Sequence, residues 1–548
     1  MKASLRRFLL ASVVVMSPGF VGAGAQVTEG SIAGTVSDQT GAIVLKAHVV
    51  ARNIATGVER STTTDTGGLY RIGFLQPGTY KVTVRFPGFG DATVEGIGVV
   101  ASVTSRADVH LSLGSVASEV EVTDASMQVD TEDGRLTTTL TQQQVQDLPT
   151  AGREVYSLAL LQPGVTATLA PVISNTESDT FNFGFSANGA TPRGNNYVVD
   201  GVSNNNEWLG GTPAISPSPE AIESFQVQTA NFSAEYGRNN GAIVITTTRA
   251  GSNAFHGSVY DYIRNPIFDA GNEFDLALTG KTKIHRNDFG VSFGGPIVKD
   301  KTFFFFNYEG VQEADSETLI GTGETPQYRA QVALYRPTSI ANTQFKLHPA
   351  GTCVPGTAVD VGSIYDENLP LATVEASPTA DQFFDGLPDG VVDSCETAYL
   401  YKKPVTGNQY TARIDHHFSD KDSMFARFIQ DTHATDTADV ELNGAAQRGF
   451  LAPLTGQFPS FMVSEIHVFN PHLLNDFRSE YARSDFGIGF VAPNSGTATY
   501  NYPYLLLDDG TSPFGGADFV PRNFVFNNFT EADTVAMQVR KHAIKTGV

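Results

Sequence analysis

The chain is poor in cysteine, in charge and in long apolar runs. It has 2 Cys among 548 residues, which excludes a disulfide-dense scaffold, an iron–sulfur protein and a cysteine-type zinc module. Charged residues make up 17%, and the 58 acidic against 36 basic residues leave a net charge of −22. Nucleic-acid binders neutralise phosphates with clustered Lys and Arg, so no nucleic-acid partner is expected. Beyond the N-terminus no run approaches the ~18 apolar residues of a spanning helix. Instead, 53 Gly and 27 Pro predict many turns.

The N-terminus has the pattern of a cleaved secretory signal peptide, residues 1–25. Basic residues within 2–7 precede an apolar stretch, 8–16, that is too short to span a bilayer. A small-residue site follows, and we expect cleavage between Ala25 and Gln26. The alternative is a buried N-terminal helix.

Export would bring the two cysteines into an oxidising compartment. Cys353 and Cys395 are then permitted to pair, with two free thiols as the alternative. A closed loop of about 42 residues would stabilise the fold by about 4 kcal/mol in the chain-entropy description.

Residues 26–114 are dense in short β-runs separated by turn residues. Strands of five to seven residues recur at about ten-residue spacing, which predicts a small β-sandwich. The segments 30–37, 65–74 and 75–80 resemble the carboxypeptidase regulatory-like domain. That resemblance implies a prealbumin-like sandwich, a class often grouped with carbohydrate-binding-like folds. Sugar binding and a passive spacer both remain open for this module.

Residues 115–250 combine two short helices, two strands and long polar loops. Thr141 and Gln144 have capping-box spacing, which predicts a short helix start. Several short motifs then follow in a fixed order: Leu148-Pro149, Gly152-Arg153, Leu160 to Val165, Asn188-Gly189, Asn195 to Val202, Pro219 to Phe225, and Ala234 to Arg238. In that order they resemble the plug domain of TonB-dependent outer-membrane receptors, with the Oar-like branch as the closest likeness.

The resemblance implies which plug residues matter. The plug-motif residues are Gly189, Asn195, Asn196, Asp200, Gly201, Glu235, Tyr236, Gly237 and Arg238. It also implies a TonB box, and the alternating run Glu119, Val120, Glu121, Val122 and Thr123 lies where such receptors carry one. An extended segment of this kind can add a strand to a partner sheet and be pulled. An ordinary linker strand is the alternative.

Residues 251–548 show the period of two that is typical of β-strands. Tyr410, Ala412 and Ile414 would share one face, and Thr411 and Arg413 the other. Strands of about ten residues with one apolar and one polar face predict a transmembrane barrel, because every backbone group must pair within lipid. A water-soluble β-sandwich is the alternative. The fold class is therefore mainly β: an N-terminal prealbumin-like β-sandwich, an α+β plug and a transmembrane antiparallel β-barrel.

The barrel predicted here is incomplete. Plugged outer-membrane transporters have about 22 strands, whereas we expect roughly eight to ten between residues 255 and 548. Residues 310–409 alternate little and are expected to form mainly a long external loop. We therefore expect an N-terminal fragment or a truncated reading frame.

Two catalytic-looking or metal-looking patterns do not hold up. Gly290 to Gly294 matches Gly-x-Ser-x-Gly, but a nucleophile elbow needs a strand, a tight turn and a helix. Asp385, Asp389 and Asp393 recur every four residues, which fits a solvated acidic loop better than a Ca²⁺ site. We predict no enzyme, no metal and no cofactor.

These expectations together predict a receptor of the outer membrane that takes up a ligand when an inner-membrane, TonB-type energy-coupling protein moves the plug. Siderophores, glycans, cobalamin and peptides all remain open as ligand, and lipid of the outer membrane would surround the barrel. The alternatives are a surface-anchored carbohydrate-binding or adhesion protein whose barrel is only an anchor, and a secreted esterase using Ser292.

Overall fold

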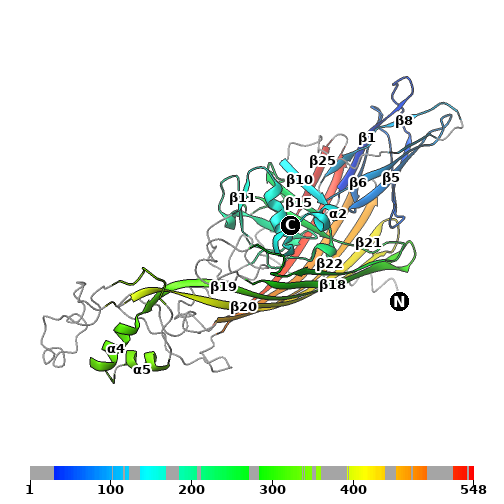
Figure 1. Ribbon diagram of the computed structural model, residues 1–548. Helices are drawn as coiled ribbons and strands as arrows, with labels where there is room; N and C mark the ends of the chain where they lie inside the picture. The colour runs from blue at the N-terminus through cyan, green and yellow to red at the C-terminus, as the bar shows by residue number, and fades with distance from the viewer. Residues whose placement is uncertain are drawn as a thin grey trace.

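The computed structural model divides into a small sandwich, a compact α+β unit and a large curved sheet (Figure 1). The described residues are 30–101, 103–114, 118–121, 136–167, 184–206, 212–237, 239–270, 283–335, 337–338, 340–347, 353–359, 392, 394–437, 452–470, 473–489, 522–539 and 542–548. None of the helices among them has the length and apolar character needed to cross a membrane. The predicted cleavage site at Ala25 and Gln26 lies outside these residues.

The first unit is the β-sandwich expected from the sequence. Its strands are β1 (Gly30–Asp38), β2 (His48–Asn53), β3 (Glu59–Thr63), β4 (Leu69–Leu75), β5 (Gly78–Arg85), β6 (Ala92–Val99), β7 (Thr104–Arg106), β8 (Val109–Leu111) and β9 (Ser118–Glu121). One sheet has the order β4-β1-β7 with β8 also on β1, and the other has the order β3-β2-β5-β6-β9. Tyr80, Val82 and Val84 share the buried face, as their alternation predicts.

The second unit is built on a mixed five-stranded sheet of order β10-β15-β16-β13-β14. Its elements are β10 (Leu136–Thr141), α2 (Gln142–Asp147), η1 (Ala151–Arg153), η2 (Val155–Leu161), β11 (Val165–Ala167), β12 (Phe185–Ala187), η3 (Pro192–Gly194), β13 (Asn196–Val199), β14 (Val202–Ser203), η4 (Pro219–Ala221), β15 (Ile222–Ala230) and β16 (Ile243–Thr248). The capping box of Thr141 and Gln144 is present, so that prediction is confirmed.

The third unit is a nine-stranded antiparallel sheet whose strands pair in sequence order. Its strands are β17 (His256–Arg264), β18 (His285–Val298), β19 (Thr302–Glu324), β20 (Ser394–His417), β21 (Asp422–Thr437), β22 (Ala452–Asn470), β23 (Leu473–Ile488), β24 (Arg522–Val539) and β25 (His542–Gly547). Nine strands agree with the expected eight to ten. Among the described residues β17 and β25 do not pair, so the sheet is an open part of a barrel, as predicted.

The two faces of this sheet differ as the lipid-facing pattern requires. Ile414 is 50% exposed on the outer face, whereas Arg413 and Asp415 are buried on the inner face. The same alternation separates Phe293 from Ser292. The second unit lies against the concave, polar face, and the sandwich lies at the end where the strand connections are short (Figure 1). Short turns are typical of the periplasmic end of such barrels.

The expectation of a long loop over residues 310–409 is wrong at its two ends, where residues 310–324 and 394–409 belong to β19 and β20. β19 and β20 pair without a break from Thr302↔His416 to Glu324↔Ser394 and extend far beyond the other strands (Figure 1). Two helices, α4 (Pro326–Tyr335) and α5 (Ile340–Leu347), lie at the far end. A disulfide joins Cys353 to Cys395 there, with their Cα atoms 5.5 Å apart. Backbone pairing thus continues through residues whose sequence alternates little between apolar and polar.

Candidate functional site: the contact between plug and barrel wall

The central side chain of the contact is Asp200, at the tip of a tight hairpin. β13 and β14 pair through Val199↔Val202, which leaves Asp200 and Gly201 as the two turn residues. Their φ angles of 51° and 83° are both positive. A two-residue turn with this geometry favours Asp-Gly, because glycine carries no Cβ. The sequence therefore places one carboxylate at the end of the sheet, facing the barrel wall.

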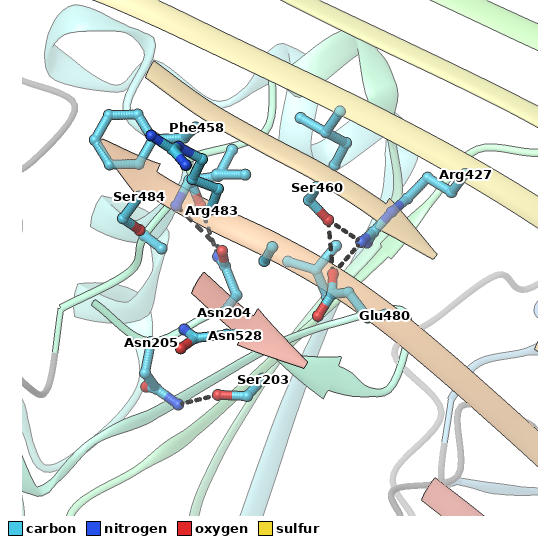
Figure 2. Close-up of a pocket in the computed structure, with 15 residues that line it drawn as sticks. Ser203, Asn204, Asn205, Arg427, Phe458, Ser460, Glu480, Arg483, Ser484 and Asn528 are labelled. Carbon is cyan, nitrogen blue, oxygen red and sulfur yellow. Dashed lines mark hydrogen bonds and ion pairs between the residues drawn. The ribbon is translucent and has the colours of Figure 1, made fainter. Parts of the chain in front are cut away.

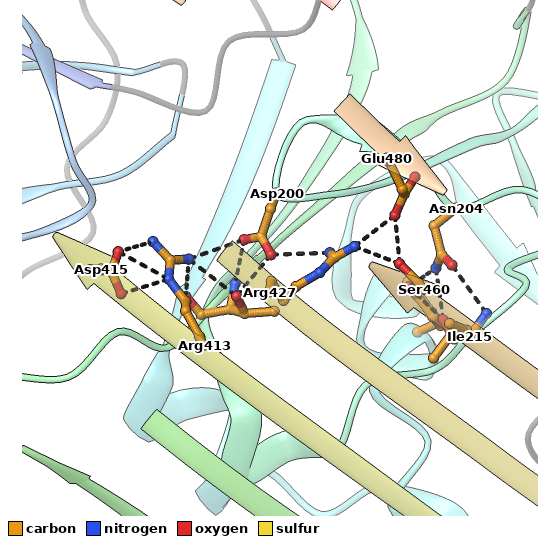
Figure 3. Close-up of polar contacts among 10 residues, drawn as sticks. Asp200, Asn204, Ile215, Arg413, Asp415, Arg427, Ser460 and Glu480 are labelled. Atoms are coloured by element: carbon orange, nitrogen blue, oxygen red, sulfur yellow. Dashed lines mark hydrogen bonds and ion pairs between the residues drawn. The ribbon is translucent and has the colours of Figure 1, made fainter. Parts of the chain in front are cut away.

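Asp200 is inserted between two arginines of the wall (Figure 3). Arg413 on β20 and Arg427 on β21 are directly opposite cross-strand partners. Like charges in that position repel each other. Asp200 Oδ2 lies 3.1 Å from Arg427 Nη1, and Asp200 Oδ1 lies 3.6 Å from Arg413 Nη1. All three side chains are buried, so solvent screens these contacts little.

Each arginine also has a carboxylate of its own in the wall. Arg413 donates to both oxygens of Asp415, with the shortest distance 2.8 Å from Nη2 to Oδ1. Arg427 Nη2 lies 2.7 Å from Glu480 Oε1, which also accepts from Ser460 Oγ at 2.6 Å. The wall thus keeps a partner for each guanidinium if Asp200 leaves, which avoids the large cost of an isolated buried charge.

A second contact lies nearer the long strand connections. Glu309 Oε2 on β19 accepts from Ser218 Oγ at 2.9 Å and from Tyr260 OH at 2.8 Å, and it lies 3.3 Å from Arg153 Nη2. The Arg153 guanidinium also lies over the ring of Tyr262, 4.0 Å from its centroid. Gln409 of the wall fixes the backbone beside it, accepting from Ser218 N at 2.6 Å.

Two glutamates of the plug carry a perturbed pKa. Burial raises the pKa of Glu223, against the opposing pull of Arg249 and Arg413. Burial likewise raises the pKa of Glu220, with Arg153 acting in the other direction. Desolvation disfavours the charged carboxylate, and the nearby arginines favour it.

A small pocket lies beside the Asp200 hairpin, between the plug and the wall (Figure 2). Plug residues Ser203, Asn204 and Asn205 line one side, and Phe458 and Glu480 are among the wall residues on the other. The lining mixes amide and hydroxyl groups with apolar side chains, and its Arg427 and Glu480 are paired with each other.

The remaining plug-motif residues shape the plug and do not converge on Asp200. Gly189 has a φ of 77° in a turn. Asn195 bridges chain segments, donating to Phe185 O at 2.7 Å and accepting from Ala242 N at 3.0 Å. Asn196 Oδ1 accepts from Asn205 Nδ2 at 2.8 Å.

The second half of the motif faces the periplasmic end of the plug. Tyr236 is buried in an apolar cluster, and Gly237 is exposed. Glu235 Oε1 lies 3.5 Å from Lys545 Nζ of β25. Arg238 lies outside the described residues.

The TonB-box candidate is described only in part. Glu119, Val120 and Glu121 belong to β9, and Val122 and Thr123 lie outside the described residues. β9 pairs in parallel with β6 at the edge of the sandwich sheet.

The structure offers little for catalysis or metal binding in its described part. Ser292 lies in the middle of β18, 2.7 Å from Ser258 Oγ, so it is on no strand-to-helix turn. One group there, Asp422, Glu465 and His467, has ligand atoms within 4.8 Å of one another. It faces away from the plug, and His467 Nδ1 already lies 2.6 Å from Asp422 Oδ1. Asp385, Asp389 and Asp393 lie outside the described residues.

The sequence reasoning missed Arg427, Glu480 and Glu309. One signal was available, since arginine and aspartate recur two residues apart on the wall strands. Arg286 and Asp288 form such a pair at 3.0 Å, like Arg413 and Asp415. Residues i and i+2 share a face of a strand, so this spacing marks charge pairs directed to one side of the sheet.

Comparisons with known proteins agree with this architecture. The family model described as "Outer membrane beta barrel domain" matches residues 247–548, "TonB-dependent Receptor Plug Domain" matches 132–244 and "Carboxypeptidase regulatory-like domain" matches 31–112. The TonB-dependent transporter Oar of Myxococcus xanthus is 30% identical over 326 residues, which cover 56% of this chain and 29% of that protein.

Solved structures overlap more loosely. The outer membrane transporter YddB from Escherichia coli aligns with a TM-score of 0.45 at 11% identity, covering 74% of this chain and 45% of that one. The siderophore receptor PirA from Acinetobacter baumannii aligns with a TM-score of 0.34 at 14% identity, covering 75% and 56%. The chain therefore spans 29% of the length of the Myxococcus relative and roughly half of each transporter structure.

Proposed function

The chain belongs to the outer-membrane β-barrel family with a TonB-dependent receptor plug, and from this premise we propose that it imports a ligand by energy-coupled movement of that plug. The family resides in the outer membrane. An inner-membrane, TonB-type protein would supply the pull, and the ligand would be a small molecule, a glycan or a peptide. No covalent chemistry is part of this proposal.

The observation that carries the proposal is Asp200 between Arg413 and Arg427. A plug that moves has two requirements. It must be bound firmly at rest, and its departure must not leave unpaired buried charges in the wall. Asp415 and Glu480 meet the second requirement, because each stays beside its arginine. The arginines of the wall are thus paired both when Asp200 is in place and when it has left. The free energy that retains the plug is the difference between these two states, and a bound ligand or a pull can shift the balance between them.

The coupling segment in this proposal is Glu119 to Thr123. Its described part is extended, as strand addition to a partner requires. We propose in addition that the chain divides into a signal peptide (1–25), a sandwich (26–114), a plug (115–250) and barrel strands (251–548), with β9 at the start of the plug segment adding to the sandwich sheet. The roles of the plug-motif residues and of the cleavage site at Ala25 and Gln26 belong to the same proposal.

The test is a deletion of residues 119–123 in the natural gene. Strains carrying the intact gene, the deletion or no gene are grown on a panel of limiting nutrients, each supplied as siderophore, glycan, cobalamin or peptide. We expect one nutrient to support growth only with the intact gene, while surface labelling shows equal amounts of the deleted protein. Equal growth of the intact and deleted strains on every nutrient that requires the gene contradicts energy-coupled import.

A further inference from the structure

Among the described residues, Asn253 links the N-terminal sandwich to the barrel. Asn253, just before β17, donates its backbone N–H to Ala55 O of the sandwich at 2.9 Å and its Nδ2 to Thr56 O at 2.8 Å. The same amide exchanges hydrogen bonds with the turn between β18 and β19. Its Nδ2 donates to Asp300 Oδ1, and its Oδ1 accepts from Asp300 N, both at 2.8 Å. A sandwich loop and a periplasmic barrel turn are thereby held by one side chain.

The sandwich is joined to the plug through an apolar contact. Ala101, in the connection after β6, is 2% exposed and packs in a cluster with Val198, Tyr236, Ile243 and Ile245 of the plug. Val198 belongs to β13 and the two isoleucines to β16, and β13 leads directly into Asp200. The sandwich therefore packs against the strands that carry the Asp200 hairpin. It lies on the side opposite the long arm formed by β19 and β20 (Figure 1).

The chain between sandwich and plug is bound to the same sandwich. β9 pairs in parallel with β6 from Ala92↔Ser118 to Glu95↔Glu121. β6 is also the strand that runs into Ala101. A pull on the segment after β9 therefore loads β6 and its contact with the plug through this pairing, as well as loading β10.

We propose that the sandwich is a periplasmic clamp: it holds the plug against the barrel, and it is released when the segment that follows β9 is pulled. The module is thus neither a passive spacer nor a freely tethered ligand-binding unit. Plug movement requires that Ala101 leaves its cluster and that Asn253 loses its hydrogen bonds. The holding role needs no ligand or partner, whereas release by a pull rests on the proposed function.

Hydrogen exchange of the whole chain in lipid nanodiscs tests the holding role. The amide of Asn253 reports docking directly, because it donates to Ala55 O. In the double variant Asn253→Ala/Ala101→Asp we expect amides of β13 and β16 to exchange about tenfold faster, equivalent to about 1.4 kcal/mol. Amides shared by β18 and β19 should not change. Asn265→Ala is the matched control, since the Asn265 side chain accepts a local bond from Ile267 N at the opposite end of β17.

Two results of this experiment would overturn the clamp. The first is an unprotected Asn253 amide in the wild-type chain, which means that docking does not occur. The second is a double variant in which that amide loses protection while β13 and β16 exchange at the wild-type rate. The single variant Asn253→Ala introduces no buried Asp and so controls for misfolding of the double variant. It should show the same faster exchange of β13 and β16 amides, but by a smaller factor.

Release is tested by pulling with optical tweezers on a handle inserted after Thr123, with the barrel held in a nanodisc. We expect a first rupture that the double variant shifts to lower force and a later plug rupture that it leaves unchanged. A single rupture of equal force in both proteins contradicts the clamp. Neither readout uses a ligand or the energy-coupling protein, so a failed clamp and a failed import proposal give different results.

Discussion

Replacing Asp200 by Asn tests the central contact most directly. Asn is nearly isosteric and keeps an oxygen for Thr248 N, now 2.8 Å from Asp200 Oδ1. It loses the charge that faces Arg427 at 3.1 Å and Arg413 at 3.6 Å. A hydrogen bond to a charged group is worth about 1.5–3 kcal/mol. The two arginines keep Asp415 and Glu480, so the larger cost of an isolated buried charge does not apply.

We therefore expect Asp200→Asn to weaken plug retention by about 2–3 kcal/mol, which is roughly 30- to 150-fold in the opening equilibrium. The assay is hydrogen exchange of β13 and β14 amides in nanodiscs. Asp485→Asn is the matched control, because Asp485 also contacts an arginine, at 2.7 Å, but on the partly exposed outer face. A surface pair of that kind is worth at most about 1 kcal/mol. Equal exchange in Asp200→Asn and wild type would refute the role assigned to the ionic contact.

Three further perturbations probe separate parts of the chain. Gly189→Ala should lower the free energy of unfolding of the plug by about 1 kcal/mol in thermal melting, because a Cβ is strained at its φ of 77° although no atom lies within 4 Å. Gly73→Ala is the control: the added Cβ has equal space there and no positive φ, so the change should be nearly neutral. Burial raises the pKa of Glu223, so the stability contributed by its protonated carboxyl is complete below the ordinary glutamate pKa and is lost as pH rises through the raised value. Glu223→Gln should therefore flatten the dependence of melting temperature on pH. An unchanged slope in this variant counts against the prediction. Reducing the Cys353–Cys395 disulfide, which closes a 42-residue separation, should loosen the arm by up to about 4 kcal/mol and speed its proteolysis, while barrel exchange stays constant.

The sequence predicted the elements well because their signals are local. Alternation identified the buried face of Tyr80, Val82 and Val84, and Thr141 with Gln144 identified the start of α2. Asp200 was named because the run Asn195 to Val202 resembles a plug motif, which is also a local signal. All of these depend on neighbours within a few positions.

The partners of Asp200 could not be predicted in the same way. That Arg413 lies opposite Arg427 depends on the register across the turn at residues 418–421, and a shift by one residue reverses every side chain. Glu480 reaches Arg427 across β22, so its place depends on two further connections. The extended arm was missed for another reason, because its sequence lacks the apolar–polar alternation that marks a strand.

The length of β19 determines how far the protein extends beyond the membrane surface. At about 3.3 Å per residue a 23-residue strand measures about 75 Å, and a tilted crossing of the ~25 Å apolar band uses roughly half of it. The remaining paired residues of β19 and β20 then extend some tens of ångströms beyond the lipid, hydrogen-bonded to each other throughout. Of the described strands, β19 and β20 would therefore reach farthest from the membrane on the side away from the sandwich.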